Sequence, residues 1–180
     1  MRWNAVSGDE EGKARRNLIL CGFMGCGKTT VGRRLARLTG RRFVDMDAFI
    51  EEEAGMRVKE IFDRYGEADF RRREREACAA LAAAEGLVIA AGGGTLTFPE
   101  NAAALAATGV IVLLEVSPET VLRRLEGDDS RPLLRRPDKA EAVRELMERR
   151  EPLYRAAASV TVSGEADPDA VAAKIHEICG

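Results

Sequence analysis

The sequence predicts an α/β fold in which a five-stranded parallel sheet is flanked by helices. Short apolar runs alternate along the chain with longer amphipathic stretches, as in βαβ units, whose helices cover both faces of a parallel sheet. A glycine-rich turn joins the first apolar run to the first amphipathic stretch. The chain has 180 residues, which accommodates about five such units of roughly 30 residues each.

The first half of the chain predicts three strands. The first strand is expected at residues 18–21 and a helix at 28–39. A short second strand at 43–45 precedes helices at 48–54 and 58–84, the longer one with a break near Gly66. The third strand, at 87–91, runs directly into three consecutive glycines.

The second half predicts two more strands. A helix is expected at 99–107 and a strand at 110–114. Pro118 opens the next helix behind a Ser117 cap. Residues 127–137 are polar and contain prolines, which indicates a loop, and a long helix follows at 138–157, which Pro152 could disrupt locally. The last strand is expected at 160–162 and the last helix at 168–179.

The composition excludes several classes of protein. The 28 basic residues nearly balance the 30 acidic ones, so the chain lacks the basic excess of a nucleic-acid binder. No apolar run approaches the roughly 20 residues that span a bilayer. Four cysteines without a CxxC pair, beside one histidine, indicate reduced thiols and no zinc site. We therefore expect a cytoplasmic monomer with a disordered leader at 1–16, a single domain at 17–180, and neither nucleic-acid nor membrane partners.

The strongest functional signal is a G-x4-G-K-T sequence between the first strand and the first helix, residues 22–29. Glycines there let backbone N–H groups surround a phosphate, and the helix N-terminus adds the positive end of its dipole. Lys28 should reach the β- and γ-phosphates, and the hydroxyl of Thr29 should ligate Mg²⁺. The sequence predicts binding of a nucleoside triphosphate such as ATP, with the remaining contacts from Gly25, Cys26, Gly27 and Thr30.

Two carboxylates close the second strand. If the alternation of a strand continues through them, Asp45 and Asp47 point the same way, toward the edge where the phosphates lie. One carboxylate can then hold the metal while its neighbour accepts a hydroxyl proton, as phosphoryl transfer requires. In the alternative interpretation, either aspartate caps a helix.

Arginines and glycines elsewhere suggest a site for an anionic acceptor. Arg71 follows the apolar Phe70 and could face inward, as could Arg150, although charge runs on helices are usually solvated. Two inward guanidinium groups would suit a small carboxylate or phosphate. Residues 92–94, all glycine, allow either the close approach of a ligand or a tight turn. Arg131, in the polar loop, could close over a transferring phosphoryl group.

Taken together, these segments resemble shikimate kinase from about residue 17 to residue 162. The resemblance rests on the order and spacing of GFMGCGKTTVGRRLA, FVDMDAFIEEEAG, EIFDRYGEADFR, the triple glycine, RRL, RPLL and REPLY. It implies the nucleoside monophosphate kinase fold, a P-loop kinase fold with strand order 2-3-1-4-5 and a lid loop. It also implies transfer of the ATP γ-phosphoryl to the 3-hydroxyl of shikimate, a step of chorismate and aromatic amino-acid synthesis.

The resemblance also implies roles for individual residues. Asp47 would hold the shikimate hydroxyls and act as the base, and Asp45 would position Mg²⁺ with Thr29. The residues expected to bind shikimate are Asp47, Arg71, Gly92, Gly93, Gly94 and Arg150, with both arginines on its carboxylate. Arg131 would contact the phosphates from the lid, and Arg124 would pack on adenine.

One segment departs from the family pattern. Some members carry a basic residue near the nucleotide in the loop before the last helix, where this chain has Gly-Glu-Ala-Asp at 164–167. The residues alone indicate only a P-loop kinase with an anionic acceptor. Two alternatives therefore stay open: another small-metabolite kinase, such as gluconate kinase, and a catalytically inactive nucleotide-binding module.

Overall fold

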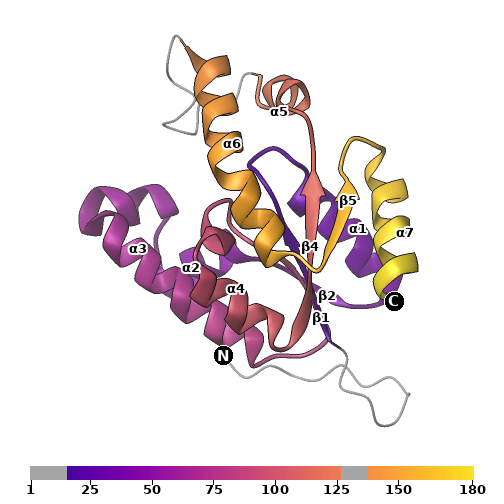
Figure 1. The fold of residues 1–180 in the computed structure, drawn as a ribbon. Coiled ribbons are helices and arrows are strands. Elements are labelled where there is room, and N and C mark those ends of the chain that lie inside the picture. The colour runs from indigo at the N-terminus through magenta and orange to yellow at the C-terminus, as the bar shows by residue number, and fades with distance from the viewer. Residues whose placement is uncertain (1–15, 127–137) are drawn as a thin grey trace.

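The computed structural model describes residues 16–126 and 138–180, and its centre is a five-stranded parallel sheet in the order β2-β3-β1-β4-β5 (Figure 1). The strands are β1 (Asn17–Cys21), β2 (Arg42–Asp45), β3 (Leu87–Ala90), β4 (Gly109–Glu115) and β5 (Val160–Ser163). In register, Ile19 of β1 lies opposite Ile89 of β3 and Ile111 of β4. The expected strand order is therefore confirmed.

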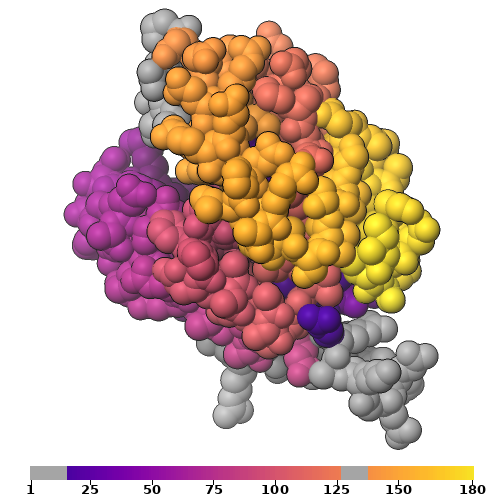
Figure 2. All heavy atoms as spheres, in the orientation of Figure 1, coloured from indigo at the N-terminus to yellow at the C-terminus, as the bar shows by residue number. Residues whose placement is uncertain are grey.

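Helices connect the strands and cover both faces of the sheet. They are α1 (Lys28–Thr39), α2 (Met46–Ala54), α3 (Val58–Ala82), α4 (Pro99–Ala106), α5 (Pro118–Arg124), α6 (Lys139–Ala157) and α7 (Pro168–Cys179), with a short 3-10 turn, η1 (Thr95–Thr97). On one face, α1 packs against α7; on the other, α4 packs against both α3 and α6. Figure 2 shows α6 and α7 covering much of the visible face, with the first part of α3 projecting at its side. No helix within residues 16–126 and 138–180 has the length and apolarity to cross a bilayer.

The predicted helix boundaries hold to within two residues, and three features differ clearly from expectation. Helix α2 begins at Met46, directly after β2, because Asp45 caps it with its side chain. The turn η1 was not expected. Helix α6 runs unbroken past Pro152, so the disruption considered there does not occur. Pro152 is exposed and the loss of its N–H costs one backbone hydrogen bond, while Tyr154 anchors the same stretch in the core.

The break at Gly66 is confirmed. Its φ of 78° and ψ of 178° lie outside the helical range and divide α3 into two helical parts. A positive φ of this kind is accessible to glycine at little steric cost. The second part of α3 thereby takes its own direction, and α3 packs against α2 and α4, with Phe70, Ala77, Cys78 and Leu81 buried.

The central strand gives the site its rigid base. From Leu18 to Cys21, no residue of β1 is more than 1% exposed, as expected for a strand with neighbours on both sides and helices on both faces. The carboxyl ends of β1, β2 and β3 meet at one edge of the sheet, which is where open α/β sheets bind their ligands.

Candidate active site

A cleft of about 510 Å³ opens at this edge of the sheet. The turn after β1, the end of β2, the turn after β3, helix α5 and the loop between β5 and α7 all contribute to its walls. Its lining includes predicted site residues from the first four of these: Gly25, Cys26, Gly27, Lys28, Thr29, Thr30, Asp45, Asp47, Gly92, Gly93 and Arg124.

The turn after β1 forms a closely packed phosphate-binding loop. Gly22, Gly25 and Gly27 all have positive φ. At Gly22 a Cβ would lie 2.6 Å from the carbonyl oxygen of Leu114, so a side chain would displace β4 or the loop. The ammonium group of Lys28 donates to the carbonyl oxygens of Gly22, at 2.7 Å, and Phe23, at 3.0 Å. The carbonyl groups of the loop therefore hold the positive charge of Lys28 at the N-terminus of α1.

Thr29 and Asp45 meet across the cleft. The Thr29 hydroxyl donates to Oδ2 of Asp45 at 2.8 Å, while Oδ1 of Asp45 accepts from the backbone N–H groups of Asp47 and Ala48. Asp45 therefore caps α2, as the alternative interpretation held, and also reaches the phosphate-binding loop. Asp47 lies in the first turn of α2, so strand alternation does not direct it. That reasoning was wrong, although both carboxylates line the same cleft.

The Thr29–Asp45 pair fits a magnesium ion. Hydroxyl and carboxylate oxygens are the hard ligands that Mg²⁺ prefers, and the ion usually takes one or two carboxylates together with substrate phosphates and water. Among the described residues there is no group of three or more acidic, histidine or cysteine side chains that could enclose a metal. The donor set therefore suits an ion shared with a phosphate better than one held by protein alone.

The triple glycine after β3 brings the acceptor-site candidates together. A Cβ on Gly92 would lie 2.9 Å from Oδ1 of Asp47, and one on Gly94 would lie 3.0 Å from Nη1 of Arg71. From α6, Nη1 of Arg150 donates to the carbonyl oxygen of Gly93 at 3.3 Å. Asp47, Arg71 and Arg150 come from three different helices and meet at one short stretch of backbone that has no side chains.

Glu74 is the site residue that sequence reasoning missed. Only 1% exposed, its carboxylate accepts from Nη1 of Arg71 at 2.5 Å and from the Thr95 hydroxyl at 2.6 Å. Burial opposes the charged form of Arg71, but hydrogen bonds and charge from Glu74 and Glu67 outweigh it and raise the pKa of Arg71. A signal was present: Glu74 lies four residues after the buried Phe70 and interrupts the apolar stripe of α3. The adjacent Arg72 forms the exposed i,i+3 and i,i+4 pairs expected of a solvated face, and Arg73 forms a half-buried pair with Asp69.

Tyr154 fixes α6 to the triple glycine. The buried phenol donates to the carbonyl oxygen of Gly93, which also accepts from Arg150 one turn earlier on the helix. Burial raises the pKa of Tyr154 to about 12, against a smaller opposing effect of Arg150. At neutral pH the phenol therefore remains protonated and keeps its donor role.

Arg124 and Glu165 join α5 to the loop before α7. The Arg124 guanidinium donates to the carbonyl oxygens of Cys26, at 3.1 Å, and Gly164, at 2.8 Å. The Glu165 carboxylate accepts from the Ser117 N–H and the Thr120 hydroxyl, both at 2.6 Å. Where this chain departs from the family pattern, the acidic side chain is thus engaged at the start of α5, and the loop presents backbone to the cleft at Gly164. Arg131, expected in the lid, lies outside the described residues.

The comparisons with known proteins agree with this geometry. The family model described as shikimate kinase matches residues 24–179. A shikimate kinase of Geobacter sulfurreducens is 49% identical over 139 residues, which cover 77% of each chain, and one of Moorella thermoacetica is 46% identical over 161 residues, covering 89% of this chain and 92% of the relative. Among solved structures, the shikimate kinase from Acinetobacter baumannii in complex with shikimate has a TM-score of 0.85 at 39% identity, covering 91% of this chain and 92% of that one. The shikimate kinase from Bacteroides thetaiotaomicron has a TM-score of 0.83 at 32% identity, covering 91% and 97%.

Replacing Glu74 by glutamine tests the buried ion pair. We expect Glu74→Gln to lower the free energy of unfolding by about 2 kcal/mol, because a hydrogen bond between charged groups is lost in a buried place. Urea denaturation measures it. The matched control is Glu76→Gln on the exposed side of α3, where the pair with Arg72 is worth less than about 1 kcal/mol. Equal effects of the two changes would contradict a special role for the buried pair.

The contacts of Glu165 make a pH-dependent contribution to stability. The Ser117 N–H, followed by the Thr120 hydroxyl, lowers the pKa of Glu165 from 4.5 to about 2. Because the folded-state pKa is below that of the unfolded chain, this stabilisation is complete above about pH 4.5 and is lost as the pH falls toward 2. Glu165→Gln should therefore lower the urea midpoint at pH 7, and the gap from the parent should narrow by pH 3. Glu85→Gln, at an exposed site, is the control, and a gap that stays constant with pH would refute the prediction.

Proposed function

The chain belongs to the shikimate kinase family, and from that membership we propose which of its residues perform each part of the reaction. A shikimate kinase transfers the γ-phosphoryl of ATP to the 3-hydroxyl of shikimate, which gives 3-phosphoshikimate and ADP on the route to chorismate and the aromatic amino acids. The observation that supports these roles is the convergence of Asp47, Arg71 and Arg150 on residues 92–94, beside the phosphate-binding loop.

The phosphate-binding loop and α5 bind ATP. The N–H groups of residues 25–30 surround the phosphates at the positive end of α1. Lys28 binds the β- and γ-phosphates from its position at the mouth of the loop. Arg124 packs on the adenine, and since it already contacts the carbonyl oxygens of Cys26 and Gly164, it joins the two stretches of backbone that flank the base.

Thr29 and Asp45 are the residues that hold Mg²⁺. The bound ion supplies positive charge that offsets the charge developing on the phosphates. Asp45 is held in place by its cap on α2, so its second oxygen stays directed at Thr29.

Shikimate, the acceptor, is bound on the side of the cleft opposite the phosphate-binding loop. Arg71 and Arg150 bind the carboxylate of shikimate, which suits the planar guanidinium group. In the structure Glu67, whose side chain is 66% exposed, accepts from Nε and Nη2 of Arg71. The incoming carboxylate takes the place of Glu67 on this outer edge, while the buried Glu74 keeps Nη1 in position.

Chemistry depends on positioning and on charge neutralisation. Asp47 binds the hydroxyls of shikimate and accepts the proton of the 3-hydroxyl as the oxygen attacks phosphorus. Gly92 makes room for this carboxylate, and the backbone of Gly93 contacts the ring substituents. Arg131 neutralises charge on the transferred phosphoryl group from the segment between α5 and α6.

The proposal extends to the setting of the enzyme. It acts as a monomer in the cytoplasm and binds neither nucleic acid nor membrane. Its nearly balanced charge supports the absence of a nucleic-acid partner. All four cysteines are free thiols, as is usual in a reducing compartment.

A substrate panel tests the reaction. The purified chain with ATP and Mg²⁺ should release ADP at a substantial rate with shikimate, and at background rate with gluconate or nucleoside monophosphates. A coupled ADP assay measures the release. Turnover with gluconate would favour the other metabolite kinase, and binding of ATP and shikimate without product would favour the inactive module.

Two arginines should separate acceptor binding from chemistry. Arg71→Ala should raise the KM for shikimate tenfold or more, because it removes a charge-assisted hydrogen bond to the acceptor. The KM for ATP should stay nearly unchanged. Arg131→Ala should instead lower kcat on the order of 10³-fold. Steady-state kinetics in both substrates provide the measurement, with Arg72→Ala on the exposed side of α3 as the control. If Arg71→Ala raised the KM of both substrates equally, the role proposed for Arg71 would be wrong. If Arg131→Ala left kcat unchanged, the role proposed for Arg131 would be wrong.

A further inference from the structure

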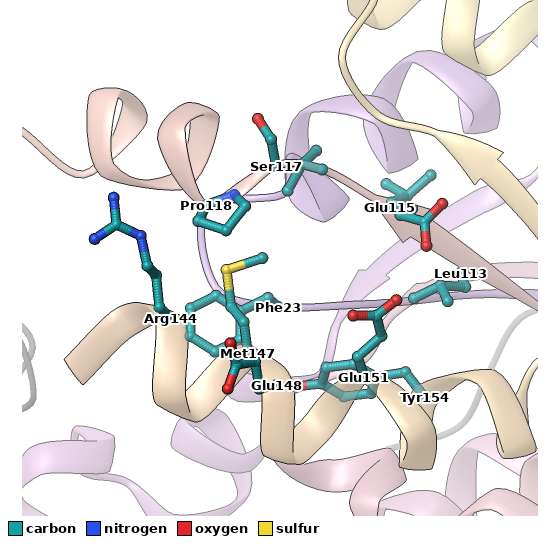
Figure 3. Close-up of a pocket in the computed structure, with 12 residues that line it drawn as sticks. Phe23, Leu113, Glu115, Ser117, Pro118, Arg144, Met147, Glu148, Glu151 and Tyr154 are labelled. Atoms are coloured by element: carbon teal, nitrogen blue, oxygen red, sulfur yellow. The ribbon is translucent and has the colours of Figure 1, made fainter. Parts of the chain in front are cut away.

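A second pocket, of about 340 Å³, lies between β4, the start of α5 and α6 (Figure 3). Among the residues that the structure describes, none lines both this pocket and the catalytic cleft. Phe23 belongs to the phosphate-binding loop but faces this second pocket, so the two cavities lie on opposite sides of that loop. Its volume is within the range of small-molecule sites, roughly 300–1,000 Å³.

The walls of the pocket are largely apolar. In Figure 3 the ring of Phe23, the side chain of Met147 and the ring of Pro118 lie close together around its middle, and Tyr154 lies farther along α6. The phenol of Tyr154 is already engaged with Gly93, so this residue offers the pocket mainly its ring. Aromatic rings and a flexible thioether together suit a flat apolar body.

Carboxylates predominate among the charged groups of the lining. Glu115 and Glu151 point toward one another at one end in Figure 3, and both are ion-paired with Arg155, which is not part of the lining. Glu148 also lines the pocket, and it has no hydrogen bond or ion pair with any residue in the described part of the chain. The one basic residue of the lining is Arg144, at the other end, where Glu119 lies 3.7 Å away.

This distribution of charge defines the kind of ligand. In the described lining, three carboxylates face one guanidinium, and the carboxylate without a partner among the described residues is Glu148. Arg144 already lies 3.7 Å from Glu119, and Glu115 and Glu151 are paired with Arg155, so the charged group of the lining left for a ligand is the carboxylate of Glu148.

We propose that this pocket binds a small molecule with a flat apolar body and one cationic group, such as an aromatic amine. The apolar body lies between Phe23 and Met147, and the cation lies beside Glu148, which has no partner among the described residues. Binding would touch the reverse side of both catalytic loops. The carbonyl oxygen of Phe23 accepts from Lys28, and Tyr154 holds the carbonyl oxygen of Gly93.

Binding is tested directly, without any use of catalysis. The probes are 1-naphthylmethylamine, the neutral 1-naphthalenemethanol and the anionic 1-naphthoate, which share one ring system and differ in charge. The protein carries methyl-labelled methionine, so that NMR observes Met147 in this pocket and Met24 in the catalytic cleft. We expect the amine to shift the Met147 methyl signal with a dissociation constant on the order of 1 mM, as is typical for a ligand of this size. The alcohol should bind more weakly, and the naphthoate weakest of the three.

A matched pair of variants tests the carboxylate. Glu148→Gln should raise the dissociation constant of the amine about threefold, as expected for loss of a solvent-exposed ion pair, and leave the affinity for the alcohol unchanged. Glu145→Gln lies on the same helix outside the pocket and should alter neither affinity. Both residues are exposed, so both variants should fold like the parent.

Three results would overturn the proposal. The first is binding of naphthoate as tight as that of the amine, and the second is a shift at Met24 in place of Met147. The third is an equal loss of amine affinity in Glu145→Gln and Glu148→Gln. Because none of these measurements depends on turnover, failure here would leave the kinase assignment intact, and an inactive kinase would leave this test intact.

Discussion

The close approach of charged side chains to the backbone of residues 92–94 is the constraint on which the rest of the site depends. A carboxylate from α2 and a guanidinium group from α3 reach this turn only because no Cβ lies in the way at Gly92 and Gly94, and a guanidinium group from α6 donates to the carbonyl oxygen of Gly93. With a side chain at Gly92, both Asp47 and Thr95 would have to move, and with one at Gly94, Arg71 would have to move. Each of these groups is far from the others in sequence. The turn after β3 therefore determines how the acceptor side of the cleft is assembled.

The pair of Arg71 and the buried Glu74 shows how the chain holds the Arg71 guanidinium in one orientation and still leaves part of it to bind another carboxylate. Removing two charges from water is costly, and a buried pair is retained only where geometry and further hydrogen bonds compensate. Here Thr95 takes the second oxygen of Glu74, and the rings of Phe70 and Phe98 lie within 5.5 and 5.2 Å of the guanidinium carbon. These contacts leave the outer edge of Arg71 to Glu67. The side chain of Glu67 is exposed, so water can hydrate its carboxylate when it leaves Arg71. The arrangement suits exchange of one carboxylate for another.

Much of the fold and part of the site could be predicted because they depend on local pattern. The alternation of apolar runs and amphipathic stretches, the G-x4-G-K-T sequence and the cap at Ser117 each carry their physical cause within a few residues. The parts that failed depend on tertiary context. Asp47 looked like a strand residue, because nothing nearby in sequence shows that Asp45 would turn back to cap α2. Glu74 lies in a run of charges typical of a solvated helix face, and although its spacing from Phe70 hints at burial, its partner Thr95 is twenty-one residues away in sequence. The engagement of Glu165 with α5 joins positions more than forty residues apart, and no local pattern predicts it.

The way α5 and α6 are anchored has a consequence for how this chain can vary over evolutionary time. Arg124 holds the end of α5 to the nucleotide side of the cleft, and Tyr154 holds α6 to the acceptor side. Lys139 donates to the carbonyl oxygen of Leu125 at 2.8 Å, so a hydrogen bond also joins the C-terminal end of α5 to the N-terminal end of α6. The intervening stretch thus departs from and returns to neighbouring fixed points. The two anchored helices, and not only the residues that line the cleft, are therefore parts of this region that can vary little without disturbing the two binding surfaces.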